Sequence, residues 1–276
     1  MVRPPDSVRK FFRASPRATV IDYVDELSSS TPESQATFIP SLRDRPDNRV
    51  VTIAELRAAK RLAPKILLLD EQTVVKVGWN VRMGEAETLL LVEENTSVPV
   101  PKMTSAYTID DIGFIVMSRV EGGGMLGHCW KDLSTEQFDK ILAQLKGYGL
   151  QWRELKDSHI WHWAAPPRDF GPFQSLDEWK NGITDAVPMR IPRLIWGFLL
   201  METCIGNIMI HNGSVSGIID WAESGYSLPE REYFGAMRIA FEDDWIQMIP
   251  RFVPEYVEEI KLWDEVDRSM RRYSPV

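Results

Sequence analysis

Histidine and tryptophan side chains gather in the middle of this sequence. His159 and His162 are three residues apart, so they can share one face of a helix or one turn. Imidazole groups act as general acids and bases near neutral pH. The tryptophans of this region are Trp152, Trp161, Trp163, Trp179 and Trp196. The pattern is compatible with an acid/base site in an apolar pocket, and also with aromatic core packing. No carboxylate or cysteine stands at ligand spacing, so a metal site is not predicted here.

Three further segments place lysine, asparagine and aspartate among apolar residues, in a fixed order. They read V-V-K-V-G at 74–78, G-F-I-V-M-S-R-V-E-G at 113–122, and G-N-I-M-I followed by G-I-I-D-W within 206–221. Taken singly, each polar residue is also compatible with an ordinary surface, cap or turn position. The ordered series is far more specific than any one of its members.

The series resembles the aminoglycoside phosphotransferase and choline kinase-like family of the protein-kinase-like fold, in particular a branch common in fungi. Further matching segments extend the resemblance over about residues 70–273: E-A-E-T-L-L-L-V at 85–92, V-P-V-P at 98–101, Q-L-K-G-Y-G at 144–149 and G-P-F at 171–173. The resemblance implies an α+β fold of two lobes, with a small β-rich N-lobe and a larger helical C-lobe.

The same resemblance implies how the N-lobe would bind ATP. Lys76 would contact the inner phosphates, and a carboxylate of the following helix would brace it. That carboxylate is Glu85 or Glu87, and the sequence does not separate the two. The backbone from Met117 to Val120 would meet the adenine ring.

In the C-lobe the resemblance implies a magnesium site and a catalytic loop. Asn207 and Asp220 would hold Mg²⁺, which prefers hard oxygen ligands. The family's loop reads H-G-D-L-x-x-x-N, and counting back from Asn207 puts Leu200 and Met201 in place of histidine and glycine. Glu202 replaces the aspartate that accepts the substrate proton. Its extra methylene moves the carboxylate by roughly 1 Å, and misplacement on that scale can cost about a hundredfold in rate. The altered loop predicts weakened phosphoryl transfer.

Three functions fit these observations. The altered loop and the aromatic region favour an enzyme of specialised metabolism, in which a repurposed kinase cleft binds a small, largely apolar metabolite. It would promote a cyclisation, isomerisation or other non-phosphoryl step without a cofactor, with Glu202, His159 and His162 as acid/base residues. The first alternative is an ATP-dependent small-molecule O-phosphotransferase that uses Mg²⁺ and takes Glu202 as its base. The second is a nucleotide-binding pseudokinase.

Composition narrows the class of protein. The 276-residue chain is 44% hydrophobic and 26% charged, which is typical of soluble globular proteins. No apolar run approaches the roughly 18 residues that span a bilayer, and the basic N-terminus lacks the apolar stretch of a signal peptide. Cys129 and Cys204 are too few for a disulfide framework. We therefore expect a cytoplasmic protein with a small-molecule partner and no membrane contact. The net charge of −8 argues against nucleic-acid binding.

Hydrophobic periodicity and turn residues indicate the elements that must position these side chains. Apolar runs at 66–69 and 73–77 flank a turn and predict two strands, and a third strand is predicted at 113–117. An apolar stripe predicts a helix over 85–94. The alternating prolines of 98–101 must be extended, because proline disfavours helix in the preceding residue.

The second half of the sequence is expected to be mainly helical. A long apolar stripe predicts a helix from 135 to 155, and an Asn-Gly turn predicts a hairpin within 208–219, with helices after it. We therefore expect an N-terminal extension over 1–50, an N-lobe over 51–118 and a C-lobe over 119–276, which together form a single domain of the family.

Overall fold

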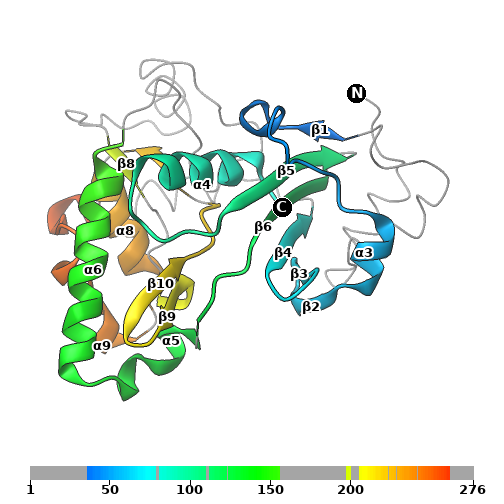
Figure 1. Ribbon diagram of the computed structural model, residues 1–276. Coiled ribbons are helices and arrows are strands. Elements are labelled where there is room, and N and C mark those ends of the chain that lie inside the picture. Colours follow the sequence, from blue (N-terminus) through cyan, green and yellow to red (C-terminus); the bar gives the residue numbers. More distant parts are fainter. Residues whose placement is uncertain are drawn as a thin grey trace, which may run out of the picture. The chain divides into compact units, whose positions relative to one another are not determined.

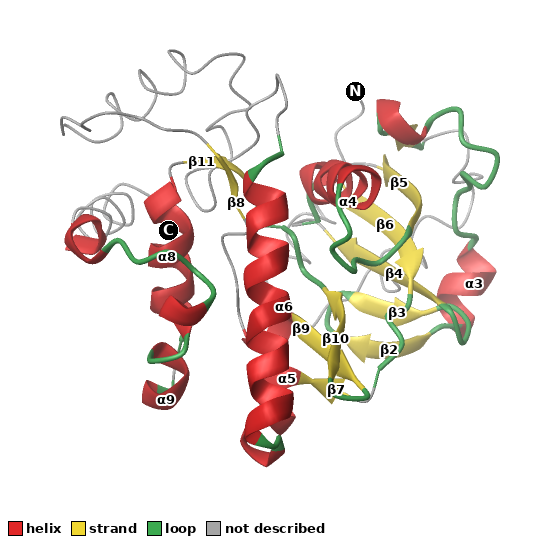
Figure 2. Ribbon diagram, turned by 60° about the vertical axis from the view of Figure 1, so that its left-hand side comes forward, coloured by secondary structure: helices red, strands yellow, loops and turns green. Residues whose placement is uncertain are grey.

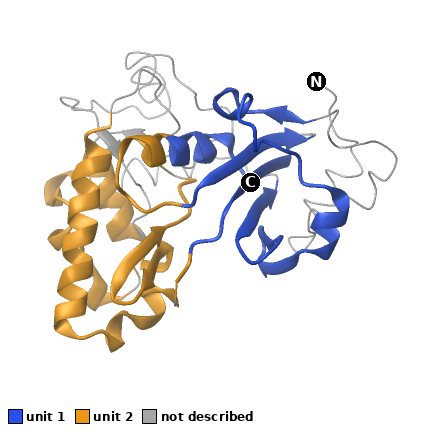
Figure 3. Ribbon diagram, viewed as in Figure 1, with its two compact units in different colours: residues 1–90, 101–120 blue, residues 91–100, 121–276 orange. Residues whose placement is uncertain are grey.

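The structure is a computed structural model of the 276-residue chain (Figure 1). It describes residues 36–78, 81–109, 112–122, 124–155, 197–199, 205–222, 224–227, 229–240 and 242–261. The chain divides into two compact units. Unit 1 comprises residues 1–90 and 101–120, and unit 2 comprises residues 91–100 and 121–276 (Figure 3). None of the helices in the described ranges has the length and apolar character needed to cross a bilayer.

Unit 1 is built on a six-stranded antiparallel sheet (Figure 1). The order across the sheet is β1-β5-β6-β4-β3-β2. Helix α4 connects β4 to β5, and β6 then returns between those two strands. The strands are β1 (Thr37–Phe38), β2 (Lys60–Ala63), β3 (Ile66–Leu68), β4 (Thr73–Gly78), β5 (Met103–Ile109) and β6 (Ile112–Ser118). The helices are η2 (Pro40–Leu42), α3 (Ile53–Ala58) and the larger part of α4 (Met83–Asn95).

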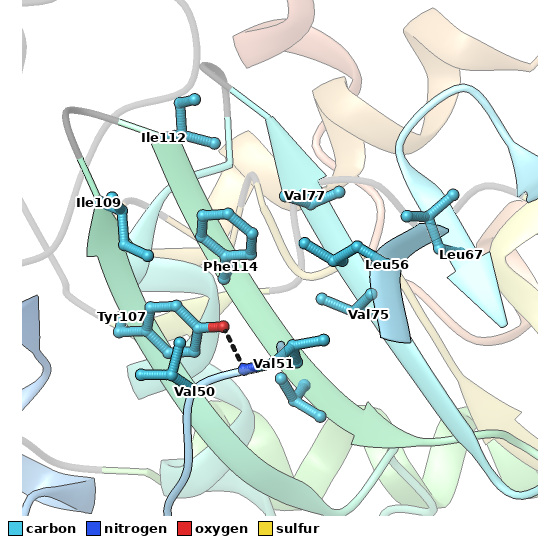
Figure 4. Close-up of a cluster of buried hydrophobic side chains, with 11 residues drawn as sticks. Val50, Val51, Leu56, Leu67, Val75, Val77, Tyr107, Ile109, Ile112 and Phe114 are labelled. Carbon is cyan, nitrogen blue, oxygen red and sulfur yellow. Dashed lines mark hydrogen bonds between the residues drawn. The ribbon is translucent and has the colours of Figure 1, made fainter. Parts of the chain in front are cut away.

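One face of this sheet carries one hydrophobic core cluster of the unit (Figure 4). Strand alternation places Val75 and Val77 of β4 in this core, and it turns Lys76 to the opposite face. Tyr107 stacks on Phe114 with ring centroids 4.9 Å apart. The Tyr107 hydroxyl accepts the backbone N–H of Val51 at 2.8 Å, which ties the chain before α3 to the sheet (Figure 4).

Unit 2 contains a three-stranded sheet, a two-stranded sheet and the long helix α6. The strands are β7 (Gly124–Met125), β8 (Gly197–Leu199), β9 (Ile208–His211), β10 (Ser214–Ile218) and β11 (Gly225–Ser227), paired in the orders β10-β9-β7 and β11-β8. The helices are α5 (Leu126–Cys129), η3 (Trp130–Asp132), α6 (Thr135–Arg153), η4 (Ile205–Asn207), α8 (Pro229–Ile239), α9 (Asp243–Ile246) and η5 (Ile249–Arg251). Figure 2 shows α6 beside β9 and β10.

Local sequence explains the central elements of unit 2. Asn212 and Gly213 both have positive φ, 49° and 70°, as the tight hairpin turn between β9 and β10 requires. A capping box starts α6, because the Ser134 hydroxyl accepts the N–H of Gln137 while the Gln137 side chain accepts the N–H of Ser134. Gln144, in the middle of α6, accepts the backbone N–H of Val215 at 3.0 Å and so holds the helix against β10.

The predicted α+β class is confirmed, as are the strands at 66–69, 73–77 and 113–117, each within a residue or two of its predicted ends. The helix from residue 135 and the Asn-Gly hairpin are also confirmed. Strand β5 was missed, because its buried positions include the polar Ser105, which is paired with the N–H of Arg49. Strand β2 was missed because all four of its residues are exposed, so its sequence does not alternate between apolar and polar side chains.

Candidate functional site

Lys76 and Glu85 form an ion pair on the face of the unit 1 sheet opposite that core cluster. The Lys76 Nζ atom lies 2.9 Å from Oε1 and 2.8 Å from Oε2 of Glu85. Only 12% of the Lys76 side chain and 1% of the Glu85 side chain are exposed. A cation held this way keeps a fixed position beside β4 and can neutralise an anion that reaches it.

A close backbone approach brings Glu85 to this position. The loop before α4 passes over β6, and a Cβ atom on Gly113 would lie 2.2 Å from the carbonyl oxygen of Val81. No other residue type fits there. Gly113 pairs with Gly78 at the end of β4, and the N–H of Val81 donates to the Gly78 carbonyl at 3.2 Å, so the loop turns at the end of the strand that carries Lys76. Helix α4 then begins at Met83 and presents Glu85 in its first turn.

The second candidate carboxylate has a different partner. Glu87 Oε2 accepts the hydroxyl of Ser41, in η2, at 2.6 Å. Residues two positions apart on a helix are rotated by about 200° around its axis, so Glu85 and Glu87 cannot both face β4. The structure therefore pairs Lys76 with Glu85, the choice that the sequence left open.

The predicted adenine-contact segment begins at the end of β6. Met117 is 8% exposed and pairs with Val74 and Met103 in the sheet. The N–H of Ser118 donates to Lys102 O at 2.8 Å, and the N–H of Arg119 donates to Gln72 O at 2.6 Å. Two successive amides of this segment are thus already engaged by neighbouring strands and turns.

Asn207 and Asp220 lie side by side at the open end of the β9–β10 hairpin in unit 2. The backbone N–H of Ile219 donates to the Asn207 carbonyl at 2.9 Å, which ties the residue before Asp220 to Asn207. Asp220 has a φ of 61°, a left-handed conformation uncommon for residues other than glycine. Such conformations cluster at functional sites. The pair supplies one amide and one carboxylate oxygen group, the ligand chemistry that suits Mg²⁺.

Comparison with known proteins decides the family. A profile of the phosphotransferase enzyme family (APH) matches residues 82–268, which is more than half of the chain. The chain belongs to this family. The resemblance to this family is thereby confirmed, while the fungal branch and the altered catalytic loop stay predictions. No curated protein sequence matches the chain.

Solved structures of phosphotransferases share the fold. The aminoglycoside phosphotransferase APH(2'')-Ib with ADP bound superposes with a TM-score of 0.53 at 12% identity, over 79% of this chain and 86% of that one. The streptomycin–ATP complex of APH(2")-IIa also gives 0.53 at 12% identity, over 82% and 93%. The enzyme APH(3'')-Id from Streptomyces rimosus gives 0.50 at 14% identity, over 74% and 88%. The predicted protein-kinase-like fold is confirmed, and at these identities the likeness concerns the fold alone.

Three residues predicted as catalytic in this phosphotransferase-family chain, Glu202, His159 and His162, lie outside the described residues. So do Leu200 and Met201 of the altered loop, and all of the clustered tryptophans except Trp152. Trp152 is fully buried near the end of α6. Within the described ranges no group of three or more histidine, cysteine, aspartate or glutamate side chains is placed to hold a metal ion.

The sequence did not predict the burial of a charged group on α8. Glu232, on α8, is 1% exposed and is bound by Arg153 and by the indole of Trp152. Burial raises the pKa of the Glu232 carboxyl, while Arg153 and the Trp152 N–H act in the opposite direction. Glu232 stands four residues before Ala236, and both lie on the buried stripe of α8, but the local sequence does not mark this stripe as buried.

Proposed function

We propose that this protein is an ATP-dependent phosphotransferase that acts on a hydroxyl group of a small molecule. The observation that carries the proposal is the ion pair of Lys76 with the buried Glu85, in a chain of the phosphotransferase family. Phosphoryl transfer depends on positioning and charge stabilisation, and a lysine held by a helix carboxylate is one of the parts that such enzymes use. The solved structures with ADP or with ATP and streptomycin support a nucleotide and a polar small molecule as ligands.

The residues present fit magnesium and a nucleotide. Lys76 is a cation already oriented by Glu85, so it suits the phosphates. Mg²⁺ is usually bound by one or two protein oxygen ligands together with substrate phosphates and water. Asn207 and Asp220 supply that number, and they start from adjacent points of the backbone. The bound nucleotide and metal would supply the transferable phosphoryl group and its charge neutralisation.

Each part of the chain then has a limited task. Lys76 neutralises phosphate oxygens, and Glu85 keeps its ammonium from turning away. The backbone N–H groups of Ser118 and Arg119 already donate to other backbone carbonyls. An adenine ring bound at this segment would therefore hydrogen-bond to the backbone carbonyl groups of the segment or to the N–H of Val120. Glu202 would accept the proton of the acceptor hydroxyl, as the aspartate of the family's loop does.

Two other functions were open from the sequence. A nucleotide-binding protein without transfer is favoured by one observation, the Leu200-Met201-Glu202 segment in place of the family's H-G-D. The non-phosphoryl enzyme acting on an apolar metabolite rests on His159 and His162, and neither the comparisons nor the described residues support that chemistry. Phosphoryl transfer is the better supported reaction.

Calorimetric titration with Mg·ADP tests the proposal. We expect micromolar binding to the wild type and a loss of about tenfold or more in Lys76→Met, because a charged hydrogen bond to phosphate is removed. Lys131→Met is the matched control, since Lys131 pairs with Glu242 at the surface. ATP with streptomycin, gentamicin and simpler hydroxyl compounds then tests transfer. Binding without any transfer would favour the pseudokinase, and no binding at millimolar nucleotide would overturn both.

A further inference from the structure

A buried carboxylate in unit 2 links two helices to the segment that carries Asp220. Glu232 lies in the first turn of α8. Its Oε1 atom accepts the indole N–H of Trp152 at 3.0 Å, and its Oε2 atom accepts the Nε–H of Arg153 at 2.7 Å. The two donors are consecutive residues at the end of α6. Each carboxylate oxygen thus has its own donor, and the plane of the Trp152 ring is fixed.

The Trp152 ring in turn restricts the orientation of the Trp221 ring. Their ring centroids are 6.1 Å apart and their planes meet at 86°, the edge-on arrangement that aromatic pairs favour. Both rings are fully buried, and close packing leaves them no independent rotation. The indole N–H of Trp221 also donates to the carbonyl of Ile218, at the end of β10, at 2.9 Å. Trp221 is therefore held from two directions.

Asp220 immediately precedes Trp221 in the chain. Its left-handed backbone persists only where the surrounding structure fixes the residues on either side. Ile219 is fixed by its hydrogen bond to Asn207, and Trp221 is fixed by its ring contacts. The direction of the Asp220 carboxylate thus depends on the ring that Glu232 orients through Trp152.

Stability alone is a weak reason for this arrangement. A buried ion pair offsets its desolvation only when the remaining polar atoms also find partners. The Arg153 Nη2 atom is buried without a hydrogen-bond partner in the described part of the chain. Apolar side chains of similar volume would hold α6 against α8 as well. The hydrogen bonds of Glu232 also fix the orientation of the Trp152 indole ring, which apolar contacts alone would not do.

We propose that Glu232 is a positioning residue for Asp220: through Trp152 and Trp221 it holds the Asp220 carboxylate in the orientation that binds Mg²⁺. This inference rests on the proposed function and deepens it, since it extends the metal site from its ligands to the buried residues that orient them. Groups that orient metal ligands typically change metal affinity by about 10–100-fold when they are replaced.

Glu232→Gln tests the proposal, because glutamine keeps the volume but has a single acceptor oxygen, so it cannot accept the N–H groups of both Trp152 and Arg153. Mg²⁺ is titrated into the protein–ADP complex by calorimetry, and ADP is titrated separately without metal. We expect Mg²⁺ binding to weaken about tenfold while metal-free ADP binding is unchanged. A merely structural role would weaken both alike and would overturn the proposal. Glu242→Gln, which breaks the exposed ion pair with Lys131 in the same unit, is expected to change neither constant.

Hydrogen exchange of the segment 216–222 gives a readout that needs no ligand. We expect its protected amides to exchange about tenfold faster in Glu232→Gln, because Trp221 loses its fixed neighbour. Unchanged exchange, with normal nucleotide binding by the wild type, overturns only the inference about Glu232. A wild type that binds no Mg·ADP overturns the proposed function instead, and the metal role of Asp220 with it.

Trp152→Phe is the second variant, and it serves if Glu232→Gln does not fold. Phenylalanine keeps a ring beside Trp221 but lacks the N–H that Glu232 accepts. We expect the same selective loss of Mg²⁺ affinity. The losses of the two single variants are expected not to add in the double variant, since both break one connection. Additive losses would mean that the residues act separately, and the proposal would fail.

Discussion

The ammonium of Lys76 lies within 2.9 Å of both carboxylate oxygens of Glu85, and Glu85 is 2% exposed. Glu87, one of two carboxylates that the sequence offered for this role, instead accepts the hydroxyl of Ser41. The two glutamates therefore form a natural pair for mutagenesis, because they have the same side chain on the same helix and different partners.

Glu85→Gln is expected to lower the free energy of unfolding by about 3 kcal/mol, because it leaves the ammonium of Lys76 without its buried counter-charge. Glu87→Gln is expected to cost less than about 1 kcal/mol, since glutamine can still accept the Ser41 hydroxyl. Urea denaturation measures both. Under the proposed function, Mg·ADP affinity falls about tenfold only in Glu85→Gln. Equal losses in the two variants would contradict the assignment of Glu85.

Gly113→Ala is expected to destabilise the protein by about 1–3 kcal/mol or to displace the start of α4, because the new Cβ would overlap the carbonyl oxygen of Val81. Gly147 in α6 is the matched control. A Cβ there meets nothing within 4 Å, so Gly147→Ala is expected to stabilise the helix by about 1 kcal/mol. Thermal unfolding followed by circular dichroism shows whether each variant is more or less stable than the wild type. A stabilised Gly113→Ala would show that the loop does not pass this close to β6.

Tyr107→Phe is expected to lower the free energy of unfolding by about 1–2 kcal/mol, because the buried N–H of Val51 loses its acceptor (Figure 4). Burial raises the pKa of the Tyr107 hydroxyl well above its ordinary value, so the group stays neutral across the physiological range. Tyr148→Phe, at a half-buried position on α6, serves as the control, with an expected change below about 0.5 kcal/mol. Denaturant titration measures the free energy of unfolding of both variants. Equal losses in Tyr107→Phe and Tyr148→Phe would mean that the hydrogen bond to Val51 does not contribute to stability.

Glu55 gives the chain a defined response to acid. Burial acts to raise the pKa of its carboxyl, but hydrogen bonds from the Thr52 N–H and hydroxyl and the charge of Arg49 lower it below its usual value. A lowered folded pKa means that the ionised group stabilises the fold above its unfolded pKa of about 4.3, and that this contribution is lost as the pH falls through the folded value.

Glu55→Gln isolates that charge, because glutamine also completes a capping box. At neutral pH the variant is expected to be less stable than the wild type by under about 1 kcal/mol, since the side chain is 36% exposed. The difference is expected to shrink as the pH is lowered towards about 3. Urea midpoints across this range measure it, with Glu71→Gln at an exposed position as the reference. A stability difference between the wild type and Glu55→Gln that grows as the pH falls would contradict a lowered pKa of Glu55 in the folded protein.

Local patterns were sufficient for much of this fold. The apolar run around Lys76 predicted β4, and the Asn212-Gly213 turn predicted the hairpin that carries Asn207 and Asp220 at its open end. These features depend on backbone preferences of a few neighbouring residues, which a sequence states directly. The order of the motifs also indicated the phosphotransferase family, which the family profile confirms.

Only the tertiary structure decided which side chains meet. Glu85 and Glu87 are equivalent in sequence, and the rotation of α4 above the sheet, set by the close contact of Val81 with Gly113, turns Glu85 to Lys76. The burial of Glu232 was equally hidden, because a glutamate in a first helical turn is ordinarily solvated. Its partners on α6 lie about 80 residues away in the sequence. Contacts over such separations depend on how whole elements pack, and no local pattern records that.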